Sequence, residues 1–331
     1  MIKYWLKALR YHFTAPSFIS ALLGSAIAVN LDLKFNILYF ILLIVAIVCN
    51  HFALNMTDDY YDYLHGVDVL KTAEEQSQYS GGSGLLVAGN ISPFAMKIAF
   101  FSFYAITSII GLYFFIELGP IILLFGLIGF FSSYYYTAPP ISFGYRGFGE
   151  LAILLNFGPL IVISSYYLQA QNITGSIVAM SLPLGFLACS MVLFNEIPDF
   201  NTDLKANKKT LVVLFGKKVG FNLAVIAITA TYVTIILSVI LNYTTKIALI
   251  SLITIPLAYK AIMLLKNSLN TPTSLGQLEM IKTHNGVGML LIIAYLIQAF
   301  IDGKNILGAS LIIIMSVLLY LPVILIVKKS S

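Results

Sequence analysis

The chain has 331 residues, of which 59% are hydrophobic and only 10% charged, and its mean hydropathy is +0.93. These values exclude an ordinary soluble domain and indicate a protein that is embedded in a membrane. The net charge of +5 does not point to nucleic acid, because no basic patch in the sequence is interleaved with solvent-facing aromatic residues.

Ten apolar stretches approach or reach the length of about 20 residues that a membrane-spanning helix needs. They cover residues 17–33, 37–57, 94–116, 119–137, 148–168, 173–195, 218–241, 245–265, 284–301 and 306–327. We therefore expect an all-α polytopic membrane protein whose nine or ten transmembrane helices surround a central cavity. A single domain over residues 1–331 accounts for the pattern, with 306–327 as a possible additional helix.

The basic residues predict how these helices are oriented, because Lys and Arg are enriched in cytoplasmic loops. With ten spans and an inside N-terminus, only Lys34, Lys246 and Lys304 of the 19 Lys and Arg residues fall outside. The longer polar connections, including 58–93 and 198–218, lie on the basic side. We expect a protein of the cell membrane whose active site faces the cytoplasm.

Carboxylates are scarce, yet they cluster where the second and the sixth apolar stretches end. The first cluster contains Asp58, Asp59, Asp62 and Asp68, and the second contains Glu196, Asp199 and Asp203 together with Asn195. If the helices continue through the clusters, acids three or four residues apart share a helix face, where like charges repel. Something cationic should therefore hold each cluster together. Both clusters begin Asn-x-x-x-Asp, at Asn55 and Asn195, which suggests two related halves around one axis.

The side-chain types in these clusters favour a particular cation. Asp and Asn oxygens without His or Cys are typical ligands of Mg²⁺, which is usually held by one or two carboxylates plus substrate phosphates. Taken singly, each acid is better explained as a solvated residue at a helix end. Two matched clusters at corresponding helix ends instead favour a pair of half-sites that clamp a diphosphate.

Two further segments allow more than one interpretation. The glycine-rich segment 80–84 lacks the Gly-Lys-Ser/Thr ending of a P-loop, so a flexible turn is the favoured interpretation. The aromatic group at the end of the fourth stretch is consistent with an interfacial belt or with a wall that stabilises a carbocation. That group consists of Phe131, Tyr134, Tyr135 and Tyr136.

Three segments resemble motifs of the UbiA superfamily of intramembrane aromatic prenyltransferases. They are residues 55–68, reading Asn-Met-Thr-Asp-Asp-Tyr-Tyr-Asp-Tyr-Leu-His-Gly-Val-Asp, residues 195–203, and residues 136–150. The first and third are most similar to the branch that prenylates 1,4-dihydroxy-2-naphthoate, in which prenyl transfer is coupled to loss of carbon dioxide. The sequence departs from the family at Phe13, where a basic residue is usual, which leaves Arg10 or His12 to substitute.

The resemblance implies a function and a set of site residues. Transfer of a prenyl group from a polyprenyl diphosphate to an aromatic acceptor is expected, with Asp59, Asp62, Asp68, Asn195, Asp199 and Asp203 holding Mg²⁺. Asp59, Asp62, Asp199 and Asp203 are the expected catalytic acids. Asn55, Tyr136 and Tyr145 lie in the matching motifs as expected substrate-binding residues. The basic residues nearest these motifs, Lys71, Arg146 and Lys209, are candidates to bind diphosphate oxygens, and Arg146 could instead orient an acceptor carboxylate.

Other functions are left open at this point. 4-Hydroxybenzoate or geranylgeranylglyceryl phosphate could be the acceptor within the same superfamily. A secondary ion transporter also carries intramembrane acids and structural repeats, but its charges should lie near the membrane midplane. A structural scaffold would leave the matched acidic clusters unexplained. The sequence does not determine the oligomeric state.

Overall fold

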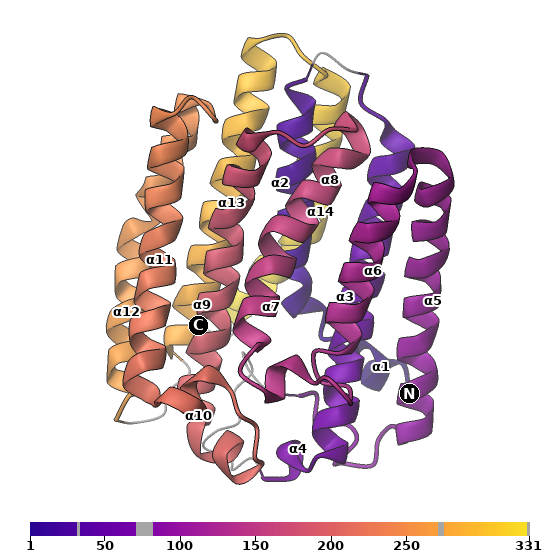
Figure 1. The fold of residues 1–331 in the computed structure, drawn as a ribbon, viewed down its shortest axis with the longest axis vertical. Coiled ribbons are helices and arrows are strands. Elements are labelled where there is room, and N and C mark those ends of the chain that lie inside the picture. Colours follow the sequence, from indigo (N-terminus) through magenta and orange to yellow (C-terminus); the bar gives the residue numbers. More distant parts are fainter. Residues whose placement is uncertain (32–33, 71–81, 271–274, 330–331) are drawn as a thin grey trace.

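The structure is a computed structural model that describes residues 1–331 except 32–33, 71–81, 271–274 and 330–331, and no side chain is described at 12 or 318–329. Almost all of the described chain is helical, and it contains no β-strand, only one isolated bridge between two loops. The long helices run side by side in one bundle (Figure 1). Three short helices, α1 (Ile2–Ala8), α4 (Val67–Leu70) and α10 (Leu211–Phe215), lie at one end of it.

Within the described residues, the long helical segments correspond one by one to the apolar stretches of the sequence. In chain order they are α2 (Ala15–Val29), α3 (Ile37–Leu64), α5 (Pro93–Leu118), α6 (Pro120–Tyr134), α7 to α8 (Gly149–Ala170), α9 (Gly175–Lys205), α11 (Lys217–Ile240), η4 to α12 (Lys246–Ser268), α13 (Leu275–Ile301) and α14 (Ile306–Lys329). Seven of them are long and apolar enough to cross a membrane, whereas α2, α6 and the described part of α14 are shorter apolar helices. The all-α prediction is confirmed.

Local sequence signals set several helix boundaries. The side-chain oxygen of Asn36 accepts the Tyr39 N–H at 3.1 Å and caps α3, and Ser92 caps α5 in the same way, just before Pro93. Gly119 separates α5 from α6 with a φ of 83°, a left-handed value that a residue without Cβ adopts freely. Capping residues and a glycine break that are visible in the sequence therefore set several of the helix ends in the bundle.

The outer faces of the bundle are apolar. Ile109 and Ile116 of α5 are 66% and 78% exposed, and Ile226 of α11 and Ile253 of η4 (Lys246–Thr254) are 62% and 66% exposed. Large aliphatic side chains at such exposure are stable only against lipid. The protein is thus an integral membrane protein, and the exposed apolar faces contact the hydrocarbon of the bilayer.

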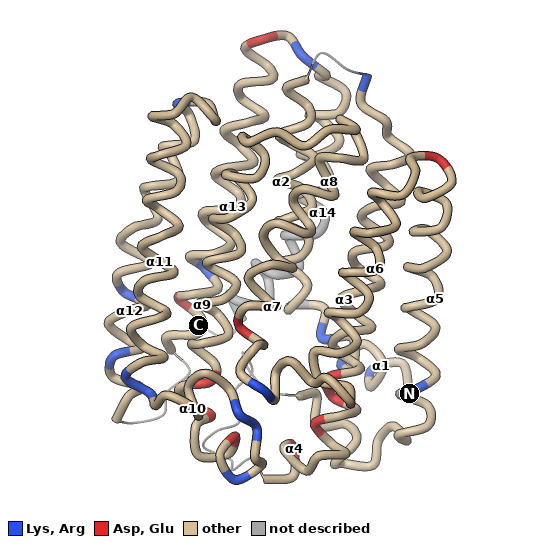
Figure 2. The backbone as a smooth tube through the Cα atoms, in the orientation of Figure 1, with Lys and Arg blue, Asp and Glu red and all other residues tan. Residues whose placement is uncertain are grey.

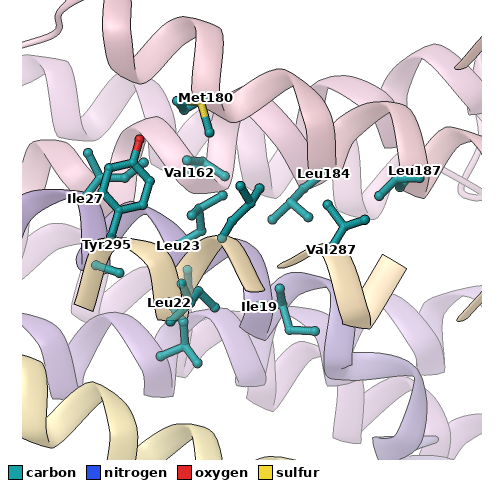
Figure 3. Close-up of a cluster of buried hydrophobic side chains, with 14 of the residues drawn as sticks. Ile19, Leu22, Leu23, Ile27, Val162, Met180, Leu184, Leu187, Val287 and Tyr295 are labelled. Carbon is teal, nitrogen blue, oxygen red and sulfur yellow. The ribbon is translucent and has the colours of Figure 1, made fainter. Parts of the chain in front are cut away.

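The centre of the bundle is α2, in which all residues from Ala15 to Val29 are buried. Side chains of α2 lie among those of α8 (Ile161–Ala170), α9 and α13 (Figure 3). Glycines permit this close packing: a Cβ added at Gly24 would lie 2.2 Å from the Val162 carbonyl oxygen. Small residues at such crossings are the usual means by which membrane helices approach one another.

The fifth apolar stretch is interrupted between α7 (Gly149–Leu155) and α8 by one π-helical turn, η3 (Asn156–Leu160). Pro159 lies inside this turn and cannot donate a backbone hydrogen bond, which accounts for the local change in helix type. Gly158 packs directly on α9, because a Cβ there would lie 2.7 Å from the Cα of Gly185. The interruption thus lets α7 and α8 follow α9 closely.

Charged residues gather at one end of the bundle, around α1, α4 and α10, whereas the apolar middle carries few (Figure 2). Both acidic clusters lie at this end, at the ends of α3 and α9. This placement agrees with the expectation that the two clusters share one side of the membrane.

Candidate active site

The first acidic cluster continues α3 as a helix to Leu64, which meets the condition under which its acids share a helix face. Asn55, Asp59 and Asp62 are therefore neighbours on one helix face, and all three are buried, at 6%, 2% and 7% exposure. Asp58 is turned toward the edge of this face, with 24% of its side chain exposed. Two closely spaced buried carboxylates demand positive charge nearby.

Arg10 supplies positive charge at this cluster. Its Nη1 lies 3.2 Å from a carboxylate oxygen of Asp58 and 3.1 Å from one of Asp59. The turn that carries Arg10 has a left-handed φ of 47° and is held by Asn55, whose amide donates to the Leu9 carbonyl at 2.9 Å. Burial disfavours the guanidinium charge, but the attraction of Asp59 and Asp58 outweighs it and raises the pKa of Arg10.

The end of the glycine-rich segment packs on the same acids. The Ser83 N–H lies 3.1 Å from both carboxylate oxygens of Asp59. A Cβ at Gly82 would lie 2.6 Å from an oxygen of Asp68 and 3.1 Å from one of Asp59. Residues 82 and 83 therefore form one wall of the acidic site rather than a turn without a role, and a larger residue at 82 would force the Asp68 carboxylate to shift. Asp68, on α4, faces this wall together with Asp59.

The second acidic cluster lies within α9, which stays helical to Lys205 through Pro198. Asn195 is half-buried, and Asp199 and Asp203 are buried at 8% and 4% exposure. The helix α4, which carries Asp68 of the first cluster, packs against α9. The two clusters, more than a hundred residues apart in sequence, therefore border one region at the charged end of the bundle.

A direct link between the two halves is made at Asp62. Lys208, just beyond α9, lies 3.5 Å from one oxygen of Asp62 and 5.2 Å from the centre of the Tyr145 ring. The Tyr145 hydroxyl donates to the other oxygen of Asp62. Lys208 remains charged: burial lowers its pKa, but Asp62 and then Asp203 raise it to a value well above that of an ordinary lysine.

The two tyrosines predicted to bind substrate differ in their contacts. Burial and the negative charge of Asp62 raise the pKa of Tyr145, so its hydroxyl keeps the proton that it donates. Tyr136 is half-buried against Gly144 and Gly149, and its pKa is raised by burial and by the neighbouring Glu196. Of the rest of the aromatic group, Tyr134 packs on Tyr61 and Tyr104, inside the bundle.

The basic residues predicted to bind the diphosphate are less well placed for that role than Arg10 and Lys208. Arg146 and Lys209 are both exposed and are joined through a parallel backbone bridge between their loops. Lys71 lies outside the described residues. Sequence reasoning had assigned no role to Lys208, which lies next to Lys209, and had considered Arg10 only as a substitute at the missing family position.

The oxygen ligands fit a hard divalent ion. In the described parts of the chain, no three His, Cys, Asp or Glu side chains converge tightly enough to hold a metal by themselves. Paired Asp and Asn oxygens at one polar end of the bundle match the donors that Mg²⁺ takes, one or two carboxylates plus water and substrate phosphates. Asp59, Asp62, Asp68, Asn195, Asp199 and Asp203 are the residues present that would hold it.

The model of the UbiA prenyltransferase family matches residues 17–280, which include both acidic clusters. The chain belongs to this family. It is therefore a prenyltransferase, and neither the transporter nor the scaffold alternative applies to it.

Characterised relatives resemble this prenyltransferase over most of its length. The 1,4-dihydroxy-2-naphthoate octaprenyltransferase of Bacillus subtilis is 26% identical over 88% of this chain and 91% of its own. The 2-carboxy-1,4-naphthoquinone phytyltransferase of Synechocystis is 24% identical over 78% of this chain and 81% of its own. The fold is similar to that of a UbiA homolog from Archaeoglobus fulgidus bound to GPP and Mg²⁺, with a TM-score of 0.59 at 18% identity, covering 87% of this chain and 98% of the homolog.

Proposed function

We propose that this prenyltransferase transfers a prenyl group from a polyprenyl diphosphate to 1,4-dihydroxy-2-naphthoate, in a Mg²⁺-dependent reaction of menaquinone biosynthesis. The acceptor is supported by the Bacillus subtilis relative and by two motifs of the naphthoate type, at 55–68 and 136–150. The observation that carries the proposal is that Lys208 and Tyr145 bring the second half of the molecule onto Asp62 of the first.

The charges at this junction suit a diphosphate. A diphosphate with bound Mg²⁺ needs carboxylates for the metal and cations for its remaining oxygens. Asp59 and Asp62 lie beside Arg10 and Lys208, so both kinds of group are present within one buried patch. When bound, Mg²⁺ neutralises diphosphate charge and stabilises the departing oxygens.

The chain's own residues then have separate roles. Lys208, fixed by Asp62 and Tyr145, binds a diphosphate oxygen and stabilises the negative charge that grows as the donor's carbon–oxygen bond breaks. Tyr136 forms part of the wall on the α7 side, close to where the acceptor ring attacks the allylic carbon. The surrounding apolar helices exclude water, which would otherwise consume the cation, and accommodate the isoprenoid tail.

The side of the membrane on which this happens is also part of the proposal. The basic residues favour the charged end as the cytoplasmic one, since among those that the structure describes only Lys34, Lys246 and Lys304 lie at the other end of the helices. A diphosphate donor made in the cytoplasm would reach such a site directly.

The test of this function is a competition among acceptors. Membranes containing the protein receive Mg²⁺, radiolabelled geranylgeranyl diphosphate and an equal mixture of 1,4-dihydroxy-2-naphthoate, 4-hydroxybenzoate and geranylgeranylglyceryl phosphate. We expect one main labelled product, the prenylated naphthoquinol, by mass spectrometry. Label on another acceptor would refute the proposed acceptor. Asp199→Ala should abolish the product while the protein remains folded, and more than half of the activity remaining would contradict the metal-binding role of this acid.

A further inference from the structure

The connection from α9 to α10, residues 206–211, forms a strap that carries Lys208 to the first acidic cluster. Asn207 has a left-handed φ of 55°, which turns the chain back, and the Lys208 N–H donates to the Asp203 carbonyl at 2.8 Å. This turn aims the Lys208 side chain at Asp62 rather than at solvent. The position of this lysine therefore depends on how firmly the strap is held.

The other end of the strap is held by the segment that precedes and begins α7. The Lys209 N–H donates to the Tyr145 carbonyl at 3.2 Å. The Leu211 N–H, at the first position of α10, donates to Oε1 of Glu150 at 2.7 Å. An N–H at that position has no partner inside its own helix, and a carboxylate is the strongest acceptor available to it.

Burying the carboxyl group of Glu150 at this position costs free energy. It is only 2% exposed, and another buried carboxyl, that of Glu196, lies beside it and shares a side-chain hydrogen bond with it. An apolar side chain would avoid the cost of burying this group. The hydrogen bond from the Leu211 N–H to Oε1 gives the carboxylate at this position a structural role that an apolar side chain could not fill.

We propose that Glu150 is a positioning residue that locks the strap to α7 and thereby holds Lys208 at Asp62. The inference rests on the proposed function, because it assigns to Glu150 control over how tightly the donor diphosphate binds. Glu150 acts through the Leu211 N–H and through Lys208, and it does not itself touch the donor.

Two substitutions remove the same hydrogen bond from opposite sides. Glu150→Leu removes the acceptor, and Leu211→Pro removes the donor at a helix position where proline is tolerated. Thr210 already has extended backbone angles, φ −67° and ψ 166°, as a residue before proline requires. Glu150→Gln keeps an oxygen acceptor and should preserve the bond.

Amide hydrogen exchange, measured by mass spectrometry on peptides covering 206–214, reports how firmly the strap is held and does not depend on prenyl transfer. We expect exchange in this segment to accelerate about tenfold or more in Glu150→Leu and Leu211→Pro, the loss expected for a hydrogen bond to a charged group. Glu150→Gln should exchange nearly as the natural protein does. Glu279→Leu is the matched control, because Glu279 is also a buried glutamate, bound by Lys260 and Lys282 away from the strap.

Steady-state kinetics then tests whether the strap affects binding of the prenyl diphosphate donor. The KM for the prenyl diphosphate should rise about tenfold in Glu150→Leu and in Leu211→Pro, with the KM for the aromatic acceptor unchanged. The double variant should be no worse than either single one, because both remove one bond. Additive effects, an unchanged donor KM in Leu211→Pro, or unaltered exchange at 206–214 would overturn the inference. Absence of prenyl transfer in the unsubstituted protein would instead overturn the proposed function, and the exchange experiment would still report on the strap.

Discussion

Arg10 bridges two carboxylates of the first acidic cluster, and its removal should destabilise the protein in a metal-dependent way. Arg10→Met keeps the length and apolar character of the side-chain stem but removes the positive charge from Asp58 and Asp59. The two contacts, at 3.2 Å and 3.1 Å, differ in burial: the Asp58 side chain is 24% exposed and that of Asp59 only 2%. The contact with Asp59 should therefore dominate the loss.

The magnitude follows from that difference. Breaking a buried ion pair from one side costs about 3–5 kcal/mol, and the half-exposed contact with Asp58 adds less than about 1 kcal/mol. The Ser83 N–H remains on Asp59 and offsets part of the loss. We therefore expect a destabilisation of about 3 kcal/mol, or a fall in Tm of about 4 °C for a chain of this size.

The assay is thermal unfolding in detergent, with and without Mg²⁺. Added Mg²⁺ should narrow the gap between Arg10→Met and the natural protein, because the ion offers Asp59 another counter-charge and binds only the folded state. Lys97→Met is the control, since Lys97 is an exposed cation at the same end of the bundle. If Arg10→Met unfolds at the same temperature as the control, or if Mg²⁺ leaves the gap unchanged, the assignment of Arg10 as the counter-charge of Asp59 is wrong.

Three more outcomes can be measured. Tyr145→Phe removes the hydroxyl that bonds Asp62 and should lower kcat about tenfold in the labelled-donor assay, with little change in Tm; an unchanged kcat would count against this contact. Gly158→Ala should lower Tm strongly, because its Cβ would meet Gly185 at 2.7 Å, whereas Gly126→Ala, with nothing within 4 Å, should not. Treatment with EDTA should abolish prenyl transfer and added Mg²⁺ should restore it; full activity after chelation would refute a metal-dependent reaction.

Much of the fold could be predicted because each membrane helix corresponds to a long apolar stretch in the sequence. Each apolar stretch became a helical segment, and α3 continues past its apolar region, so Asp59 and Asp62 share a helix face as expected for a continuous helix. The need for a cation beside these acids was also a sound deduction from charge repulsion. Which cation meets them depends on turns outside the helices, and hydrophobic periodicity carries no information about such turns.

Lys208 and Lys209 illustrate that limit. They are adjacent and chemically identical, yet the backbone turn at Asn207 directs Lys208 to Asp62 and leaves Lys209 exposed. Gly82 presents a similar case, because the close packing at this glycine arises from the approach of the Asp68 and Asp59 side chains, which belong to other elements. Long-range contacts of this kind are absent from any local pattern.

Arg10 and Lys208, the cations that contact the first acidic cluster, lie about 200 residues apart in the sequence. They are therefore synthesised at different stages of translation. Arg10 and its partners Asp58 and Asp59 have all been translated once α3 is finished. Lys208 follows only after six of the long helical segments that the structure describes, α2 through α9, have been translated. The ion pairs between Arg10 and the first acidic cluster therefore join residues that are translated well before the connection that carries Lys208.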